Sequence, residues 1–395
     1  MRYLSTHGGA EPASFTEVLV AGLAPDGGLF QPETIPGLPE GWESWSYQEA
    51  VAGSLQIYGA PEPRPVVDRA AERFHHPEIA PLVEVGDRLV LELFWGPTLS
   101  FKDHALQVLA RLMEREVDSG VALGATSGDT GSAAIEAFRG RESLRIVVLF
   151  PEGRVSDFQR RQMTAVPDEN VTAVAVRGTF DDCQALVKEA FASNPGLLAV
   201  NSINWARIAA QVGYYLHAAV RVGEPFDVAV PAGNFGNAYS CWLAKQMGAP
   251  ILTITLANNA NRALFDLVHN EMPHATVVPT IAPAMDIQAP SNLERFDGDL
   301  SEEFGAGWST DEEIVTTIAE VEAAYGYRLD PHTATAWRAG EKTKSDRRQV
   351  VVGTAHPAKF GGTVPTPEWL PRLEGLKERV TVIDPEPSEL AALIR

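Results

Sequence analysis

The sequence predicts an α/β protein whose parallel sheets are covered by helices on both faces. From about residue 105 onward, short apolar segments alternate with longer amphipathic segments, an order typical of parallel strands joined by helices. Several apolar segments are followed directly by loops rich in glycine, hydroxyl and amide side chains. Because parallel sheets bind ligands beyond the carboxyl ends of their strands, we expect the chemistry of this protein in those loops.

Seven apolar segments have the length of a buried strand. They lie at residues 121–125, 144–150, 171–176, 197–200, 227–230, 251–256 and 350–352. The amphipathic segments between them predict helices at residues 130–138, 185–192 and 205–220. Gly140 ends the first of these helices, since glycine readily adopts the left-handed conformation of a helix C-terminus.

The chain of 395 residues is long enough for two domains. Residues 1–90 predict an irregular leader with one short helix at 15–23. We expect a smaller α/β domain at 91–215 and a larger one at 216–395, with the leader packed on the larger domain and the ligand in the cleft between the two domains.

Composition narrows the function classes. The formal net charge of −20 argues against nucleic acid or an acidic membrane surface as a partner. Two cysteines cannot build a disulfide framework, and the N-terminal residues lack an apolar signal segment, so we expect a cytoplasmic protein. Neither a paired-cysteine motif nor H-E-x-x-H occurs, and no metal site is expected. The sequence leaves the oligomeric state open.

One lysine has an unusual setting. Residues 92–103 place Lys102 at the start of a helix, behind a Gly96–Pro97 turn and beside aromatic side chains. Partial desolvation there favours the neutral, nucleophilic amine, the form that Schiff-base chemistry with a carbonyl cofactor needs. Taken alone, the motif is weak, because a lysine after Ser-Phe is usually a solvated surface residue.

A first polar loop covers residues 125–131, between a predicted strand and a predicted helix. The hydroxyls of Thr126, Ser127 and Thr130 lie among two glycines and Asp129, and backbone N–H groups at a helix N-terminus attract anions. Ordinary helix capping is the alternative. Capping needs only one such side chain, so the density of polar groups favours a ligand site.

A second loop covers residues 231–237. Gly233 and Gly236 allow a close backbone approach, and the helix that follows adds positive potential. The spacing fits neither the dinucleotide fingerprint nor a Walker loop. A compact phosphate would suit it, and an ordinary strand-to-helix turn is the alternative.

Two further segments follow predicted strands. Thr354 could present its hydroxyl beyond the strand at 350–352, although a lone threonine at a strand end is more often structural. Residues 201–207 carry amides and a hydroxyl before Arg207, whose guanidinium suits bidentate binding of a phosphate. The alternative is N-capping by Ser202 or Asn204, with an exposed arginine.

Taken together and in order, these motifs resemble the threonine synthase family, pyridoxal-phosphate enzymes of the tryptophan-synthase-β fold type (fold type II). The matching segments span nearly the whole chain. They are residues 14–19, 27–32, 96–103, 126–131, 201–204, 233–237, 284–287 with 291–292, and 353–360.

The resemblance implies a role for each candidate residue. Lys102 would form the Schiff base with pyridoxal 5′-phosphate and act as the base at carbon α, Asp129 would lie near the ring hydroxyl, and Thr354 would contact the pyridine nitrogen. The cofactor phosphate would be held by Gly233, Asn234, Phe235, Gly236 and Asn237. The substrate phosphate would be held by Thr126, Ser127, Thr130, Asn201, Ser202, Asn204 and Arg207.

The implied reaction converts O-phospho-L-homoserine and water into L-threonine and phosphate by β,γ-elimination and addition of water. Two alternatives remain at this stage. One is a serine or threonine dehydratase-like enzyme of the same fold type, against which the predicted phosphate site with Arg207 argues. The other is a non-catalytic binder of a phosphorylated metabolite, which would have no need of Lys102.

Overall fold

The computed structural model describes residues 1–274, 276–343, 345–361 and 364–395. The chain forms two compact units, each built from several stretches of sequence. Unit 1 contains residues 1–31, 102–207 and 367–395, and unit 2 contains residues 32–101 and 208–366. The expected α/β class is confirmed, since each unit is built around a sheet whose strand pairs are all or mainly parallel.

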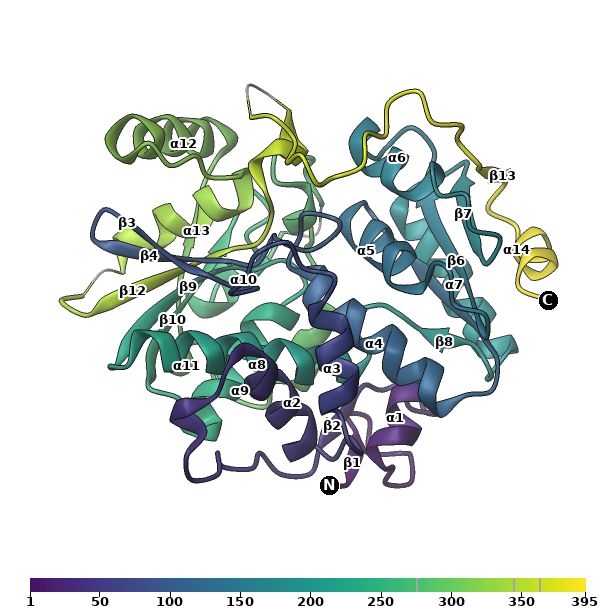
Figure 1. The fold of residues 1–395 in the computed structure, drawn as a ribbon, viewed down its shortest axis with the longest axis horizontal. Coiled ribbons are helices and arrows are strands. Elements are labelled where there is room, and N and C mark those ends of the chain that lie inside the picture. Colours follow the sequence, from purple (N-terminus) through teal and green to yellow (C-terminus); the bar gives the residue numbers. More distant parts are fainter. Residues whose placement is uncertain (275, 344, 362–363) are drawn as a thin grey trace. The chain divides into compact units, whose positions relative to one another are not determined.

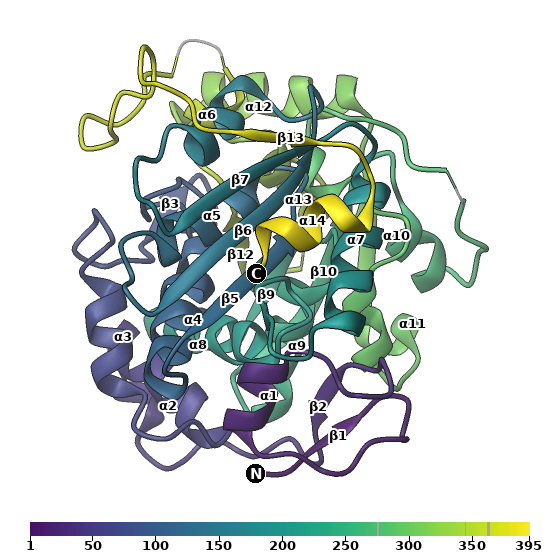
Figure 2. The same ribbon diagram turned by 90° about the vertical axis from the view of Figure 1, so that its right-hand side faces the viewer.

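Unit 1 holds a five-stranded parallel sheet in the order β13-β7-β6-β5-β8 (Figure 2). Its elements are β1 (Tyr3–Ser5), α1 (Phe15–Ala21), β2 (Phe30–Pro32, ending at the boundary), α4 (Lys102–Glu116), β5 (Gly120–Ala125), α5 (Asp129–Phe138), β6 (Leu144–Pro151), α6 (Asp157–Thr164), β7 (Val171–Val176), α7 (Phe180–Ser193), β8 (Leu198–Ala199), β13 (Thr381–Ile383) and α14 (Pro387–Leu393). The three central strands are almost wholly apolar because helices cover both faces of such a sheet.

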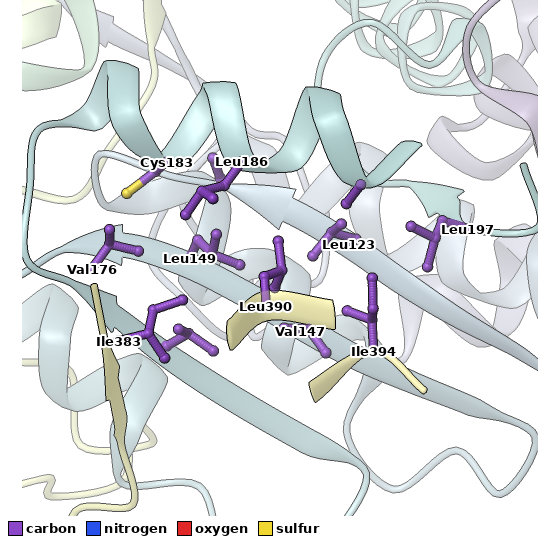
Figure 3. Packing of buried hydrophobic residues seen from close by; sticks show 13 residues of the cluster. Leu123, Val147, Leu149, Val176, Cys183, Leu186, Leu197, Ile383, Leu390 and Ile394 are labelled. Carbon is purple, nitrogen blue, oxygen red and sulfur yellow. The ribbon is translucent and has the colours of Figure 1, made fainter. Parts of the chain in front are cut away.

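The apolar cluster on one face of this sheet joins distant parts of the chain. Side chains of β5, β6 and β7 pack with Cys183 and Leu186 of α7 and with Leu390 of α14 (Figure 3). Ile383 of β13 belongs to the same cluster and pairs with Val176. The last residues of the chain therefore complete the core of unit 1.

Unit 2 holds a six-stranded sheet in the order β11-β10-β9-β12-β4-β3, in which only β3 runs antiparallel to its neighbour (Figure 1). Its elements are η1 (Trp42–Ser44), α2 (Tyr47–Ile57), α3 (Arg64–Ala71), β3 (Leu82–Val85), β4 (Arg88–Glu92), α8 (Trp205–Val222, which begins in unit 1), β9 (Phe226–Pro231), α9 (Gly236–Met247), β10 (Ile251–Asn258), α10 (Ala263–Val268), η2 (Pro283–Met285), η3 (Ser291–Arg295), α11 (Leu300–Glu303), β11 (Phe304–Trp308), α12 (Asp311–Tyr325), α13 (Pro331–Lys342), β12 (Arg348–Gly353) and η4 (Pro357–Phe360).

All seven predicted strands are present. The prediction of an irregular leader over residues 1–90 is wrong, because this stretch forms α2 and α3 as well as four strands. Ser46 and Glu49 build a capping box that starts α2, a signal visible in the sequence. Predicted helix 185–192 begins earlier, at Phe180, where Thr179 and Asp182 form another capping box.

The two units also divide the chain differently from the expected segments 1–90, 91–215 and 216–395. Residues 1–31 belong to unit 1, because Tyr3 is fully buried and its ring packs edge-on against Trp205 at 5.7 Å. Residues 367–395 also belong to unit 1, because β13 extends its sheet next to β7.

Candidate active site

The segment before Lys102 is fixed by backbone hydrogen bonds within unit 2. The N–H of Phe101 donates to the carbonyl of Thr354 at 2.8 Å, and the N–H of His356 donates to the carbonyl of Leu99 at 3.0 Å. Leu99 adopts a left-handed conformation with φ of 61°, which is rare for a branched side chain. These bonds tie the residues preceding Lys102 to the segment after β12.

A buried lysine supports the same segment. Lys359 is only 3% exposed, and its Nζ donates to the carbonyl of Thr98 at 2.9 Å. Thr98 belongs to the Gly-Pro-Thr turn that precedes Lys102. No sequence pattern links Lys359 to Thr98, because 261 positions separate the two residues.

Replacing Lys359 with methionine is therefore expected to destabilise the fold by about 1–3 kcal/mol, because a buried carbonyl loses its donor. Urea unfolding measures the change. The matched control is Lys342→Met, because Lys342 is exposed, and its effect should stay within about 0.5 kcal/mol. Equal midpoints for the two variants would contradict the anchoring role of Lys359.

In unit 1, Lys102 begins α4 and its side chain is 13% exposed. Its Nζ lies 3.9 Å from Oδ2 of Asp129. The other carboxylate oxygen, Oδ1, accepts a hydrogen bond of 2.9 Å from Nε2 of Gln159. Gln159 thus fixes the orientation of the carboxylate that faces Lys102, a contact that the sequence analysis missed.

The first polar loop is shaped by Thr126. Its hydroxyl accepts hydrogen bonds from the N–H groups of Gly128 and Gly131, at 2.8 and 2.9 Å, so this threonine caps α5. Ser127 is exposed and Thr130 is half-buried. Of the three hydroxyl residues predicted to touch substrate, Thr126 has a clear structural role.

The segment after β8 lies beside this loop. A Cβ atom on Gly124 of β5 would come within 2.7 Å of Oδ1 of Asn201, and β5 and β8 are parallel neighbours in the sheet. Ser202 is half-buried, whereas Arg207 is 2% exposed and its guanidinium donates to the carbonyl of Val200 at 3.0 Å. The structure therefore brings the two predicted substrate-phosphate segments to one sheet edge.

Asn204 instead holds backbone. Its Nδ2 donates to the carbonyls of Leu19 and Ala199, at 2.9 and 3.1 Å, and its Oδ1 accepts from the N–H of Ala206 at 3.0 Å. The side chain is fully buried. These contacts match the capping alternative for Asn204, and they also attach α1 to the start of α8.

Replacing Asn204 with alanine is expected to lower stability by about 3 kcal/mol, because two buried carbonyls and one buried N–H lose their partner. The control is Ser127→Ala at an exposed position, with an expected change within about 0.5 kcal/mol. Thermal and urea unfolding measure both. An unchanged midpoint for the Asn204 variant would show that these contacts contribute nothing.

In unit 2, the loop after β9 is tightly packed. A Cβ atom on Gly233 would lie 2.7 Å from the carbonyl oxygen of Ala284, so only glycine fits there. Phe235, with φ of 62°, is the N-cap residue of α9 and makes no side-chain cap hydrogen bond. The first N–H groups of α9 are thus left for another acceptor, and a phosphate is the acceptor that helix N-termini favour.

The side chain of Asn237 also has a hydrogen-bond donor that a bound anion could accept. Its Oδ1 accepts the hydroxyls of Tyr214 and Tyr215, which leaves the amide group to donate. Among the described residues, Nδ2 of Asn237 is buried without a hydrogen-bond partner. A buried unpaired donor is costly, and an anion bound at this loop is a fitting acceptor.

Thr354 follows β12, the parallel neighbour of β9. Its N–H donates to Oγ1 of Thr333 at 3.4 Å, and the Thr333 hydroxyl donates to the carboxylate of Asp330, the N-cap of α13. All three side chains are buried. The structure thereby places Thr354 next to the 231–237 loop at one sheet edge, supported by residues that no sequence signal linked to it.

Two models of known protein families match this chain, and they define the class of protein to which it belongs. A model of pyridoxal-phosphate-dependent enzymes matches residues 79–354, which include Lys102 and all four polar segments. A model of the threonine synthase N terminus matches residues 2–60. The protein is therefore a lyase of the pyridoxal-phosphate-dependent class, with pyridoxal phosphate as its cofactor.

Individual relatives narrow this class to one family. Threonine synthase from Pseudomonas aeruginosa is 39% identical over 459 residues, covering 99% of this chain and 97% of the relative. The crystal structure of PLP-bound threonine synthase from Brucella melitensis superimposes with a TM-score of 0.93 at 38% identity, covering 100% of this chain and 98% of that one. Threonine synthase from Escherichia coli gives a TM-score of 0.90 at 31% identity, with 100% and 99% covered. The chain belongs to the threonine synthase family.

These findings confirm the family, fold type and cofactor that the sequence predicted, and they favour a threonine synthase over the dehydratase-like and binding alternatives. Within the described ranges, no helix is both long and apolar enough to span a membrane. The same ranges contain no cluster of three or more histidine, cysteine or acidic side chains suited to a metal ion.

Proposed function

We propose that the substrate of this threonine synthase is O-phospho-L-homoserine, which reacts with one water molecule to give L-threonine and inorganic phosphate. The observation that carries the proposal is the sheet edge formed by β5 and β8, where a buried arginine follows hydroxyl and amide side chains. A buried guanidinium is suited to a phosphate ester. An unphosphorylated amino acid offers no phosphate group for this guanidinium to bind.

On the cofactor side, Lys102 would carry pyridoxal phosphate covalently, and the loop Gly233–Asn237 would bind the cofactor phosphate. Thr354 would contact the pyridine nitrogen, and Asp129 would lie near the ring hydroxyl. The free N–H groups of α9 and the unpaired amide of Asn237 support the phosphate assignment. When bound, the cofactor supplies an electron sink for negative charge at carbon α.

Lys102 would move the proton at carbon α of the substrate. Asp129, whose Oδ2 lies 3.9 Å from Nζ, would orient the amine, and Gln159 holds that carboxylate in place. A neutral hydroxyl at Thr354 cannot keep the pyridine nitrogen protonated as a carboxylate would. Stabilisation of the leaving phosphate therefore carries more of the catalysis.

For the substrate phosphate, we assign direct contacts to Ser127, Thr130, Asn201, Ser202 and Arg207. Thr126 and Asn204 would act indirectly, because the side chain of each makes at least two hydrogen bonds to backbone groups that shape the two loops. Together these donors would neutralise the charge that develops on the departing phosphate, despite the acidic balance of the chain.

The test is product formation by the cofactor-loaded protein. Threonine and phosphate should appear in equal amounts from O-phospho-L-homoserine, whereas L-homoserine should give neither. Release of products from serine or threonine, with none from the phosphorylated substrate, would overturn the proposal in favour of a dehydratase.

We also propose the cytoplasm as the compartment of this protein, supported by two buried cysteines that form no disulfide.

A further inference from the structure

Behind the Gly233–Asn237 loop lies a buried arginine that no role assigned above uses. Arg295 ends η3 and is 2% exposed. Its guanidinium donates a hydrogen bond to Oδ1 of Asn292. Burial lowers the pKa of Arg295 to about 10 because the charged form loses its water, yet the group still carries its positive charge at neutral pH.

Asn292 connects this charge to the loop. Because Oδ1 accepts from Arg295, the amide nitrogen faces the other way and donates to the carbonyl of Asn234 at 3.1 Å. The same nitrogen lies 3.2 Å from where a Cβ atom on Gly236 would be. Ser291 adds two bonds, with its N–H and hydroxyl donating to Oδ1 of Asn234 at 2.6 and 2.9 Å.

The bond from Asn292 acts on a peptide group of the loop itself. The carbonyl of Asn234 shares its peptide plane with the N–H of Phe235, the N-cap residue of α9. A donor at the carbonyl end polarises the peptide and strengthens donation by its N–H end. A cation one hydrogen bond further back enhances this effect, since it polarises the Asn292 amide in turn.

We propose that Arg295, acting through Asn292, is the positioning residue that makes the Gly233–Asn237 loop selective for a phosphorylated cofactor. The proposal rests on the assignment of this loop to the cofactor phosphate. Arg295 itself stays behind the loop. Its buried charge offsets part of the negative charge of the phosphate, and its hydrogen bond fixes the direction of the Asn292 amide.

The experiment compares two ligands, pyridoxal phosphate and pyridoxal, which differ only in the phosphate. Equilibrium dialysis with the cofactor-free protein gives a dissociation constant for each. In Arg295→Gln, we expect binding of pyridoxal phosphate to weaken by about tenfold or more, with pyridoxal changed by less than about twofold. Equal weakening of both ligands, or no change in either, would overturn the proposal.

Arg295→Lys keeps the charge but loses the planar guanidinium, so it should retain most of the preference for pyridoxal phosphate. This variant also tests the proposal if the glutamine variant misfolds. A lysine variant as unselective as the glutamine one would refute the electrostatic role. The control is Arg88→Gln, which removes another buried arginine of unit 2, bound to the carbonyl of Trp337. It should leave the ratio of the two constants unchanged.

The variant Gly233→Ala distinguishes the proposed role of Arg295 from the assignment of the Gly233–Asn237 loop to the cofactor phosphate. Gly233→Ala forces a Cβ atom to within 2.7 Å of the Ala284 carbonyl and should also weaken pyridoxal phosphate selectively. If it weakens both ligands equally, the loop does not hold the phosphate and the proposed assignment fails. If Gly233→Ala is selective and Arg295→Gln is not, only the role of Arg295 fails.

Discussion

Replacing Lys102 with alanine is expected to lower threonine formation by about a thousandfold or more, since one side chain both attaches the cofactor and moves the proton at carbon α. The fold should survive, because the segment before α4 is held by backbone bonds from Phe101 and His356 rather than by the lysine. Steady-state assays of threonine and phosphate measure the loss, and circular dichroism monitors the fold.

Two controls sharpen this expectation. Borohydride reduction of the loaded protein, followed by peptide mapping, should find the cofactor on the peptide that contains Lys102. Lys188→Ala, at an exposed position on α7, should keep full activity and the same labelled peptide. Retention of more than about a tenth of the activity in the Lys102 variant would assign the chemistry to another group.

Replacing Arg207 with glutamine is expected to lower kcat/KM for O-phospho-L-homoserine by about a hundredfold to a thousandfold, as loss of a preorganised donor does elsewhere. Glutamine keeps a polar group near the carbonyl of Val200, which the guanidinium binds at 3.0 Å. Cofactor binding should change little, because the proposed contacts to the cofactor come from other residues. Initial rates and cofactor titration measure the two effects separately.

Arg207 is buried, so its replacement can also destabilise unit 1. Thermal unfolding of the variant therefore accompanies the kinetics, and Arg177→Gln at an exposed site of the same unit provides the matched control. Arg207→Lys should recover part of the rate, since it restores the charge without the bidentate geometry. An Arg207→Gln variant that is folded, loaded and fully active would rule out the phosphate contact.

The sequence predicted those parts of the fold that depend on local pattern. β5, β6 and β7 are continuous apolar segments because both sheet faces are covered, and such segments are recognisable without knowing their neighbours. The prediction for the N-terminal ninety residues is wrong because α2 and α3 are too short to show a long periodic pattern. A capping box starts α2, and α3 starts without any side-chain cap. Strand β13 was not predicted, because it is short and its partner β7 lies far earlier in the sequence.

The candidate site, too, was predictable from the sequence only where the signal is local. Glycines and hydroxyls that directly follow strands identified the loops, because strand ends in parallel sheets bind ligands. The residues that hold those loops in place could not be predicted, because each one binds a partner that is far away in the sequence. Gln159 reaches Asp129 across 30 positions, Asn292 reaches Asn234 across 58, and Lys359 reaches Thr98 across 261.

The C-terminal residues have a consequence for biosynthesis. Because β13 and α14 supply part of the core of unit 1, this unit cannot finish folding until residues 381–393 have left the ribosome. Until then, β7 exposes an unpaired edge and the neighbouring apolar side chains face water, a situation that favours aggregation. The apolar face beside β7 therefore stays incomplete while about 200 further residues are translated, a period in which chaperone binding would limit aggregation.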